Sequence, residues 1–202
     1  MLNETDTMYP VRGNLLRTSN RDPIITTAEA KDWLRVDYDL EDSIIDRAVL
    51  SVQDELEPPN GWLGRALSEA DYTLYLPRFA DKIIMPAPPL INIESVEYLH
   101  IDGTTVTVDA ADYRVVLREP AYLLPTHGKS WPSGVDTDKP DAVQIKFKAG
   151  YSNANNVPDG IKQFILYQVS QIHDLRNPVV VGTSVAEVPH IRHSLESWRI
   201  RV

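Results

Sequence analysis

The chain has 202 residues, no cysteine and a formal net charge of −9. The lack of cysteine excludes a disulfide framework, a thiolate metal site and a cysteine nucleophile, and it fits a reducing cytoplasm. Hydrophobic residues make up 43% of the chain, which is enough for a core, and the length suits one domain with or without an inserted module. The acidic balance is unlike that of proteins that grip duplex DNA by its phosphates, although an acidic protein can still surround DNA.

Residues 1–24 are polar and show little periodicity, so we expect an extended N-terminal arm and no signal peptide. No apolar run is long enough to cross a bilayer, so we expect no membrane partner.

Two helices are predicted next. The spacing of Thr26 and Glu29 is that of a capping box, which predicts a short helix that stops near Val36. Asp39 is the expected N-cap of a second helix. That helix carries an apolar stripe and ends at the Pro58–Gly61 turn signal. The stripe consists of Leu40, Ile44, Ile45, Ala48, Val49, Val52 and Leu56.

Residues 70–151 are predicted to form a small antiparallel β module. Asp102 and Gly103 have the composition of a two-residue type I′ hairpin turn. Strand composition and prolines between the strands support the module. The expected strands are 71–76, 91–101, 104–108, 113–117 and 142–149.

Helical spacing returns after residue 157. Pro158 suits the first helical position, and Asn177-Pro178 is the expected end of this helix. A last short amphipathic segment holds Ile191, Leu195 and Trp198. Short helices cannot bury their apolar stripes alone. We therefore expect an α+β fold in which residues 25–69 and 152–202 form a small helical bundle with the β module inserted between them.

Three short motifs suggest chemistry, and each has a simpler interpretation. His127–Ser130 ends like a phosphate-binding loop, but Leu123 stands where a second glycine is needed, which favours a plain turn. Asp37–Glu41 begins like a calcium loop, but Asp42 and Ala48 occupy its glycine and glutamate positions, which favours a helix start. We therefore expect no nucleotide or calcium site.

His190 and His193 lie three residues apart, with Glu187 and Glu196 on either side. On a regular helix this set could hold a metal, but Pro189 interrupts it, which favours a structural or surface role. No nucleophile elbow or dinucleotide-binding glycine motif occurs. We expect no metal, no cofactor and no catalytic residues.

Charge is unevenly spread along the chain. Residues 37–57 contain eight acids and one base, whereas residues 192–202 contain three arginines and one acid. One interpretation is a solvated helix face and a chance basic tail. The other is head-to-tail self-association, because opposite charges on different surfaces suit contacts that close into rings.

The order of several segments resembles the head–tail connector (adaptor) proteins of tailed phages. The resemblance begins at residue 25 with ITTAEAKDWLRVDYDLEDSIIDRAVLSVQDELE and continues through GRAL at residues 64–67. It continues with PAPPLINIESVEYLHIDGTT, DYRV, SWP, AVQIKFKAGY and VPDGIKQFILYQVSQIHDLR. Each motif is short, but the shared order over residues 25–202 is specific.

This resemblance implies a non-enzymatic ring protein of the virion, usually a dodecamer, that assembles in the host cytoplasm. It would dock beneath the portal protein, present a platform to the stopper or tail protein, and let DNA pass through its lumen without sequence-specific binding. Family members often grip the portal with the C-terminal segment. The candidate contacts with the portal or a neighbouring copy are therefore Leu195, Trp198, Arg199, Ile200 and Arg201, although Trp198 could instead pack on its own core.

An acidic lumen would repel phosphate and let DNA slide, so we expect some carboxylates of residues 37–57 to face the lumen or a neighbouring subunit. The candidates are Asp42, Asp46, Asp54 and Glu55. Two alternatives remain at this point. One is another virion joint protein, such as a stopper, a tail-completion protein or a baseplate binding module. The other is an acidic cytoplasmic hydrolase.

Overall fold

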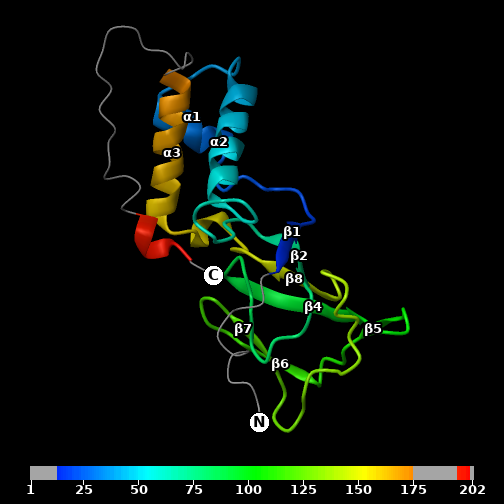
Figure 1. Cartoon of the computed structure of the whole chain (residues 1–202). Helices are drawn as coiled ribbons and strands as arrows, with labels where there is room; N and C mark the ends of the chain where they lie inside the picture. Colours follow the sequence, from blue (N-terminus) through cyan, green and yellow to red (C-terminus); the bar gives the residue numbers. More distant parts are fainter. Residues whose placement is uncertain (1–12, 175–194, 201–202) are drawn as a thin grey trace. The chain divides into compact units, whose positions relative to one another are not determined.

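The structure, a computed structural model, describes residues 13–174 and 195–200 and has an α+β fold, as the sequence predicts (Figure 1). The described chain divides into two compact units, which are treated separately below. The β unit contains residues 13–19 and 70–149, and the helical unit contains residues 20–69, 150–174 and 195–200.

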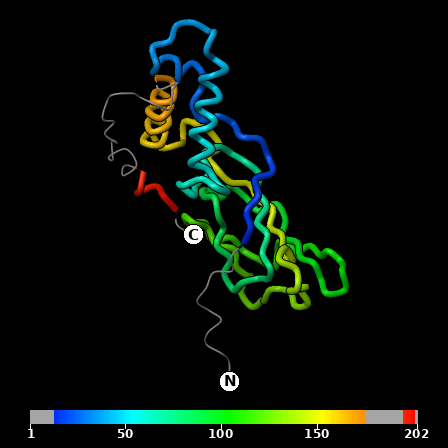
Figure 2. The backbone as a smooth tube through the Cα atoms, turned by 45° about the horizontal axis from the view of Figure 1, so that its top comes forward, coloured from blue at the N-terminus to red at the C-terminus, as the bar shows by residue number. Residues whose placement is uncertain are grey.

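Three α-helices and two short 3-10 helices make up the helical unit. Figures 1 and 2 show α2 and α3 side by side, and α1 contacts both of them. Their apolar stripes meet in one core, to which Ile24, Leu63 and Leu195 also contribute fully buried side chains. The elements are α1 (Thr27–Leu34), α2 (Asp42–Leu56), η1 (Ala154–Asn156), α3 (Asp159–Asp174) and η2 (Glu196–Trp198).

The start of α1 confirms the predicted capping box. The Thr26 side chain accepts a hydrogen bond from the Glu29 amide, and the Glu29 carboxylate accepts one from the Thr26 amide at 2.9 Å. The helix ends where Arg35 adopts the left-handed conformation, with φ 58°. The capping box therefore marks the start of α1 and the left-handed Arg35 marks its end, eight residues later.

The predicted starts of the other two helices need correction. The N-cap of α2 is Glu41, without a side-chain capping bond, because the carboxylate of Asp39 is bound to Lys31 Nζ at 2.6 Å. Pro158 is the residue before α3, and its carbonyl accepts hydrogen bonds from the amides of Ile161 and Lys162. Proline therefore takes the capping position of α3 rather than the first helical position.

The β unit consists of two antiparallel sheets. The larger has the strand order β1-β2-β8-β4-β5, and the smaller has the order β3-β7-β6. The sequence did not predict β1, β3 or β7. The strands are β1 (Asn14–Arg17), β2 (Ala70–Leu76), β3 (Ile83–Ile84), β4 (Leu90–Leu99), β5 (Thr105–Thr107), β6 (Tyr113–Val116), β7 (Tyr122–Pro125) and β8 (Val143–Ala149).

Alternation along β2 and β8 sorts their side chains into a buried face and a polar face. Tyr72 pairs with Phe147 across the strands, both are buried, and their rings stack at 5.6 Å. The next pair along, Asp71 and Lys148, points to the other face and forms an ion pair at 3.4 Å. The buried face supplies the core of the β unit.

The hairpin between β4 and β5 differs from the predicted type I′ turn. Its loop has three residues, because the amide of His100 donates to the carbonyl of Thr104 and that of Gly103 donates to the carbonyl of His100. Within this loop only Gly103 has a positive φ, of 86°. A three-residue loop needs one left-handed residue at its end, so Asp102 is free to turn its carboxylate toward Thr104.

Candidate functional site

Negative charge is concentrated on the helical unit. Its described residues include fifteen acids and seven bases, whereas those of the β unit include eleven acids and nine bases. The helical unit is therefore the part of the described chain whose electrostatic field would repel phosphate or attract a basic partner.

Three of the four candidate acids have structural partners within the helical unit. Asp42 forms an ion pair with Lys31 at 2.8 Å, and Asp54 forms one with Arg21 at 2.5 Å. Asp46 accepts a hydrogen bond from the Thr27 hydroxyl at 2.6 Å. These contacts hold α2 against α1 and against the segment before α1. The three carboxylates therefore stabilise the fold of the single chain.

Glu55 differs from the other three candidates. It is exposed on the last turn of α2, and its carboxylate contacts no polar group among the described residues. The C-terminal end of a helix carries partial negative charge, so an acid there is slightly unfavourable. Of the four candidate acids, Glu55 is the one whose carboxylate is available to a partner or to solvent.

A buried carboxylate at the end of α2 organises the surrounding loops, and the sequence did not predict it. Glu57 has a side chain with 0% exposure. Its Oε1 accepts hydrogen bonds from the amides of Leu67 and Ser68 at 2.7 and 2.8 Å, and its Oε2 accepts one from Arg21 Nε at 2.8 Å. This network joins the segment before α1, the end of α2 and the segment that leads toward β2.

The loop Trp62–Arg65, here called the cradle, holds the C-terminal segment Leu195–Ile200. The amide of Ile200 donates to the carbonyl of Leu63 at 2.9 Å, and Arg65 Nε donates to the carbonyl of Trp198 at 3.3 Å. The Arg199 guanidinium lies over the Trp62 ring, 4.9 Å from its centroid. The cradle thus recognises both the main chain and a side chain of this segment.

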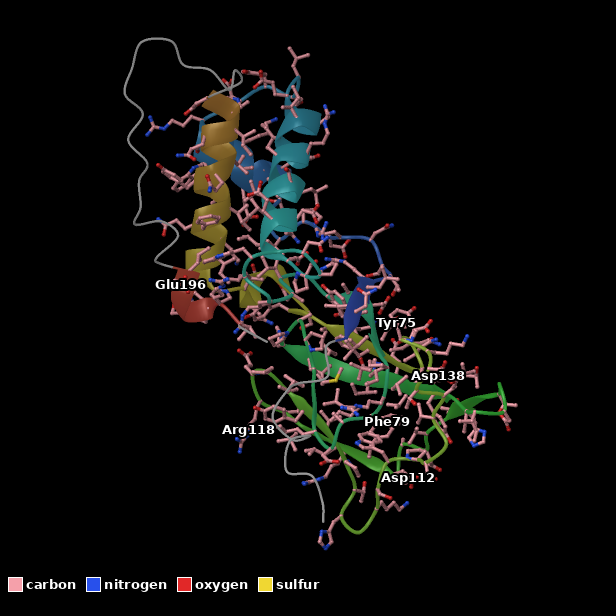
Figure 3. The ribbon with its side chains drawn as sticks, in the orientation of Figure 1. Tyr75, Phe79, Asp112, Arg118, Asp138 and Glu196 are labelled. Atoms are coloured by element: carbon pink, nitrogen blue, oxygen red, sulfur yellow. The ribbon has the colours of Figure 1, made fainter. Side chains whose placement is uncertain are left out.

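The structure assigns different environments to the C-terminal candidates. Leu195 is fully buried in the helical core, so its side chain anchors the segment. Trp198 keeps 36% of its surface exposed, close to Gly160 in the first turn of α3, and Glu196 marks this region in Figure 3. Arg199 and Ile200 contact the cradle, whereas Arg201 lies outside the described residues. Their role in contacts with a portal or a neighbouring copy stays a prediction.

Two of the short motifs lie in the described part of the chain, and both contribute side chains to ion pairs, through Lys129 and Asp39. His127–Ser130 lies in a turn in which Lys129 forms an ion pair with Asp112, and Gly128 has φ 79°. The region of His190, His193 and Glu187 lies outside the described residues. No group of three or more potential metal ligands occurs within residues 13–174 and 195–200. In those same ranges no helix is both long and apolar enough to span a membrane.

Known proteins match this chain in fold but not in sequence. No family model and no curated protein sequence matches the chain. The fold is similar to that of chains in the necks and virions of gene transfer agent particles.

The similarity covers nearly the whole of both chains in each comparison. A chain from the neck of an empty particle, computed with C6 symmetry, has a TM-score of 0.72 and 20% identity over 94% of this chain and 97% of that one. A chain from a native virion has a TM-score of 0.68 and 21% identity over 93% and 96%. A chain from a native neck, computed with C12 symmetry, has a TM-score of 0.67 and 19% identity over 94% and 97%.

Proposed function

We propose that this chain is a structural protein of the head–tail joint of a tailed phage or phage-like particle. The observation that carries the proposal is the similarity in fold to neck chains of gene transfer agents, which extends over 94% of this chain and 97% of the other. A match of that extent means that both units and their order along the chain are common to the two proteins. The segments that resemble phage connectors, from ITTAEAKDWLRV onward, support the same role independently.

Within the joint, the proposed role is that of a ring-forming adaptor beneath the portal protein, to which the stopper or tail attaches. Two of the similar structures were computed with C6 and C12 symmetry, which supports a cyclic arrangement. The uneven charge of the chain suits head-to-tail contacts between copies. The proposed location is the virion, with assembly in the host cytoplasm, and the proposed activity is mechanical rather than catalytic.

We assign residues 25–69 and 152–202 to the connector core, residues 70–151 to an inserted module, and residues 1–24 to an arm. In the ring, the acids of α2 would face the lumen or a neighbouring subunit, with Glu55 as the leading candidate because its carboxylate is free among the described residues. Trp198, Arg199, Ile200 and Arg201 would contact the portal or a neighbouring copy. DNA would pass through the acidic lumen without being bound.

The test is co-expression of the chain with the portal protein of its parent particle, followed by light scattering and electron microscopy. We expect a complex in which this chain forms a cyclic ring on one end of the portal. A chain that binds a preformed adaptor ring but not the portal would instead be a stopper. A chain that binds neither would overturn the assignment to the head–tail joint.

A further inference from the structure

The contact between the cradle and the C-terminal segment joins parts of the chain that are more than 130 residues apart. It combines a buried anchor, Leu195, with a main-chain hydrogen bond from Ile200 to Leu63. Peptide-recognition sites use the same combination, in which main-chain bonds provide affinity and a side-chain pocket provides specificity. The cradle therefore has the properties of a site for a peptide segment.

Gly64 shows that the cradle is fitted closely to the main chain of that segment. It has a φ of +68°, and a Cβ atom placed there would lie 2.6 Å from the carbonyl oxygen of Ile200. Such a distance is too short for any side chain, and the positive φ independently favours glycine. Glycine is therefore the residue that allows the C-terminal segment to approach the cradle at position 64.

The connection between α3 and the segment is long. Twenty residues separate Asp174 from Leu195. The 16 residues of α3 extend for about 24 Å, whereas twenty residues can reach about 68 Å. Helices in bundles are usually joined by about 2–8 residues, and connections beyond about 15 residues usually have a function. The tether is therefore longer than a return along α3 in the same subunit requires.

None of the cradle contacts requires the segment to come from the same chain. The donors, acceptors and buried surface would be identical if the segment of an adjacent copy occupied the site. We propose that, in the assembled ring, the cradle of each subunit receives Leu195–Ile200 of a neighbouring copy. The inference rests on the ring proposed above, and it names the contact that would link its subunits.

Exchange of this kind costs little free energy. The same contacts form in both states, so the balance depends on the tether and on how close the neighbouring cradle lies. A free monomer would hold its own segment, as the structure describes, and ring closure would present a second cradle to the same tether. Each exchanged segment then buries Leu195 in the core of the next subunit and holds the two copies together.

The absence of cysteine allows a direct test. One variant carries Trp62→Cys and an affinity tag, and the other carries Arg199→Cys. The two side chains meet in the structure, so a short bismaleimide can join cysteines at these positions. Rings assembled from a mixture of the two variants, with portal where assembly needs it, are treated with the reagent. We expect covalent heterodimers, which a segment held by its own subunit cannot give.

The matched control is Arg199→Cys combined with Ile200→Pro, which removes the amide that donates to Leu63. Arg199 has φ −71° and ψ 128°, a conformation that a following proline accepts. We expect the heterodimer yield to fall by up to about tenfold, because the loss of one hydrogen bond weakens docking of the segment by at most about that factor. Rings without heterodimers, or with a yield that the control does not lower, would overturn the exchange alone. Failure to form any ring would overturn the proposed function as well.

Discussion

Glu57 shows how one buried carboxylate can determine the path of three segments. Its two oxygens accept hydrogen bonds from Leu67, Ser68 and Arg21, so none of these donors is buried without an acceptor. Replacement by glutamine keeps the size of the side chain but removes the charge and turns an amide group toward a donor. We expect Glu57→Gln to lower the free energy of unfolding by about 3 kcal/mol, measured by urea denaturation.

Glu55 provides a matched control on the same helix turn, because it is exposed and its carboxylate has no polar contact among the described residues. We expect Glu55→Gln to change the free energy of unfolding by less than about 0.5 kcal/mol. Equal effects of the two substitutions would mean that the Glu57 network does not stabilise the fold.

A second prediction for a single residue concerns the pKa of the Asp102 carboxyl group. Hydrogen bonds from the side chain and then the backbone of Thr104, followed by one from His100, lower the pKa of Asp102 from 3.8 to about 2. Because the folded pKa is below the unfolded value, the stabilising contribution is complete above pH 3.8 and is lost as the pH falls toward 2. A carboxyl titration followed by NMR should give a midpoint near 2.

Thr104→Val removes the hydroxyl donor and keeps the backbone amide, so we expect the midpoint of Asp102 to move upward toward 3.8. An unchanged midpoint in this variant would show that the hydroxyl is not a cause of the lowered pKa.

Among the α-helices in the described part of the chain, α1 depends most on local signals, because it is the shortest, with eight residues. Its capping box satisfies two amides that would otherwise lack partners. We expect Thr26→Ala to destabilise the protein by about 1 kcal/mol, measured by thermal unfolding. Thr27→Ala is the matched control, because Thr27 makes only an exposed hydrogen bond to Asp46. A larger loss from Thr27→Ala than from Thr26→Ala would contradict the role of the box.

The sequence predicts those elements best that carry long patterns of their own. The stripe of α2 and the alternation in β8 are such patterns, and both elements form over most of the expected ranges. Two members of the predicted stripe are wrong, because Leu40 lies before α2 and is 89% exposed, and Ile44 is 44% exposed. The start of α2 was placed wrongly at Asp39, because sequence spacing cannot show that Lys31 binds the Asp39 carboxylate. A local capping preference was overridden by an ion pair with a residue on another helix.

Strand β7 was missed although it pairs with the neighbouring β6, because it contains Pro125, a residue that is unusual within strands. Strands β1 and β3 could not be predicted, because each has four residues or fewer and forms through pairing with a distant strand. The same limit applies to the candidate site. The acids of α2 were visible in the sequence, but the cradle depends on a contact across more than 130 residues. The one available signal was Gly64, an isolated glycine that a strained turn or close approach would require.

For the whole molecule, the uneven charge of the two units leads to a test with DNA. The helical unit has many more acids than bases, so a ring that brings copies of it around a lumen would repel phosphate. We expect the assembled ring to show no measurable binding of duplex DNA by fluorescence anisotropy at about 50 mM salt, where charge-driven binding is strong.

Glu55→Lys should then create affinity for DNA that falls steeply with added salt, because every copy would present a new cation and each phosphate contact releases counterions. Asp138→Lys in the β unit changes the net charge equally, and Asp138 is exposed (Figure 3). If Glu55 faces the lumen, its substitution should increase DNA binding much more than that of Asp138. Equal increases would show that net charge alone governs the interaction, and the lumen assignment of Glu55 would then fail.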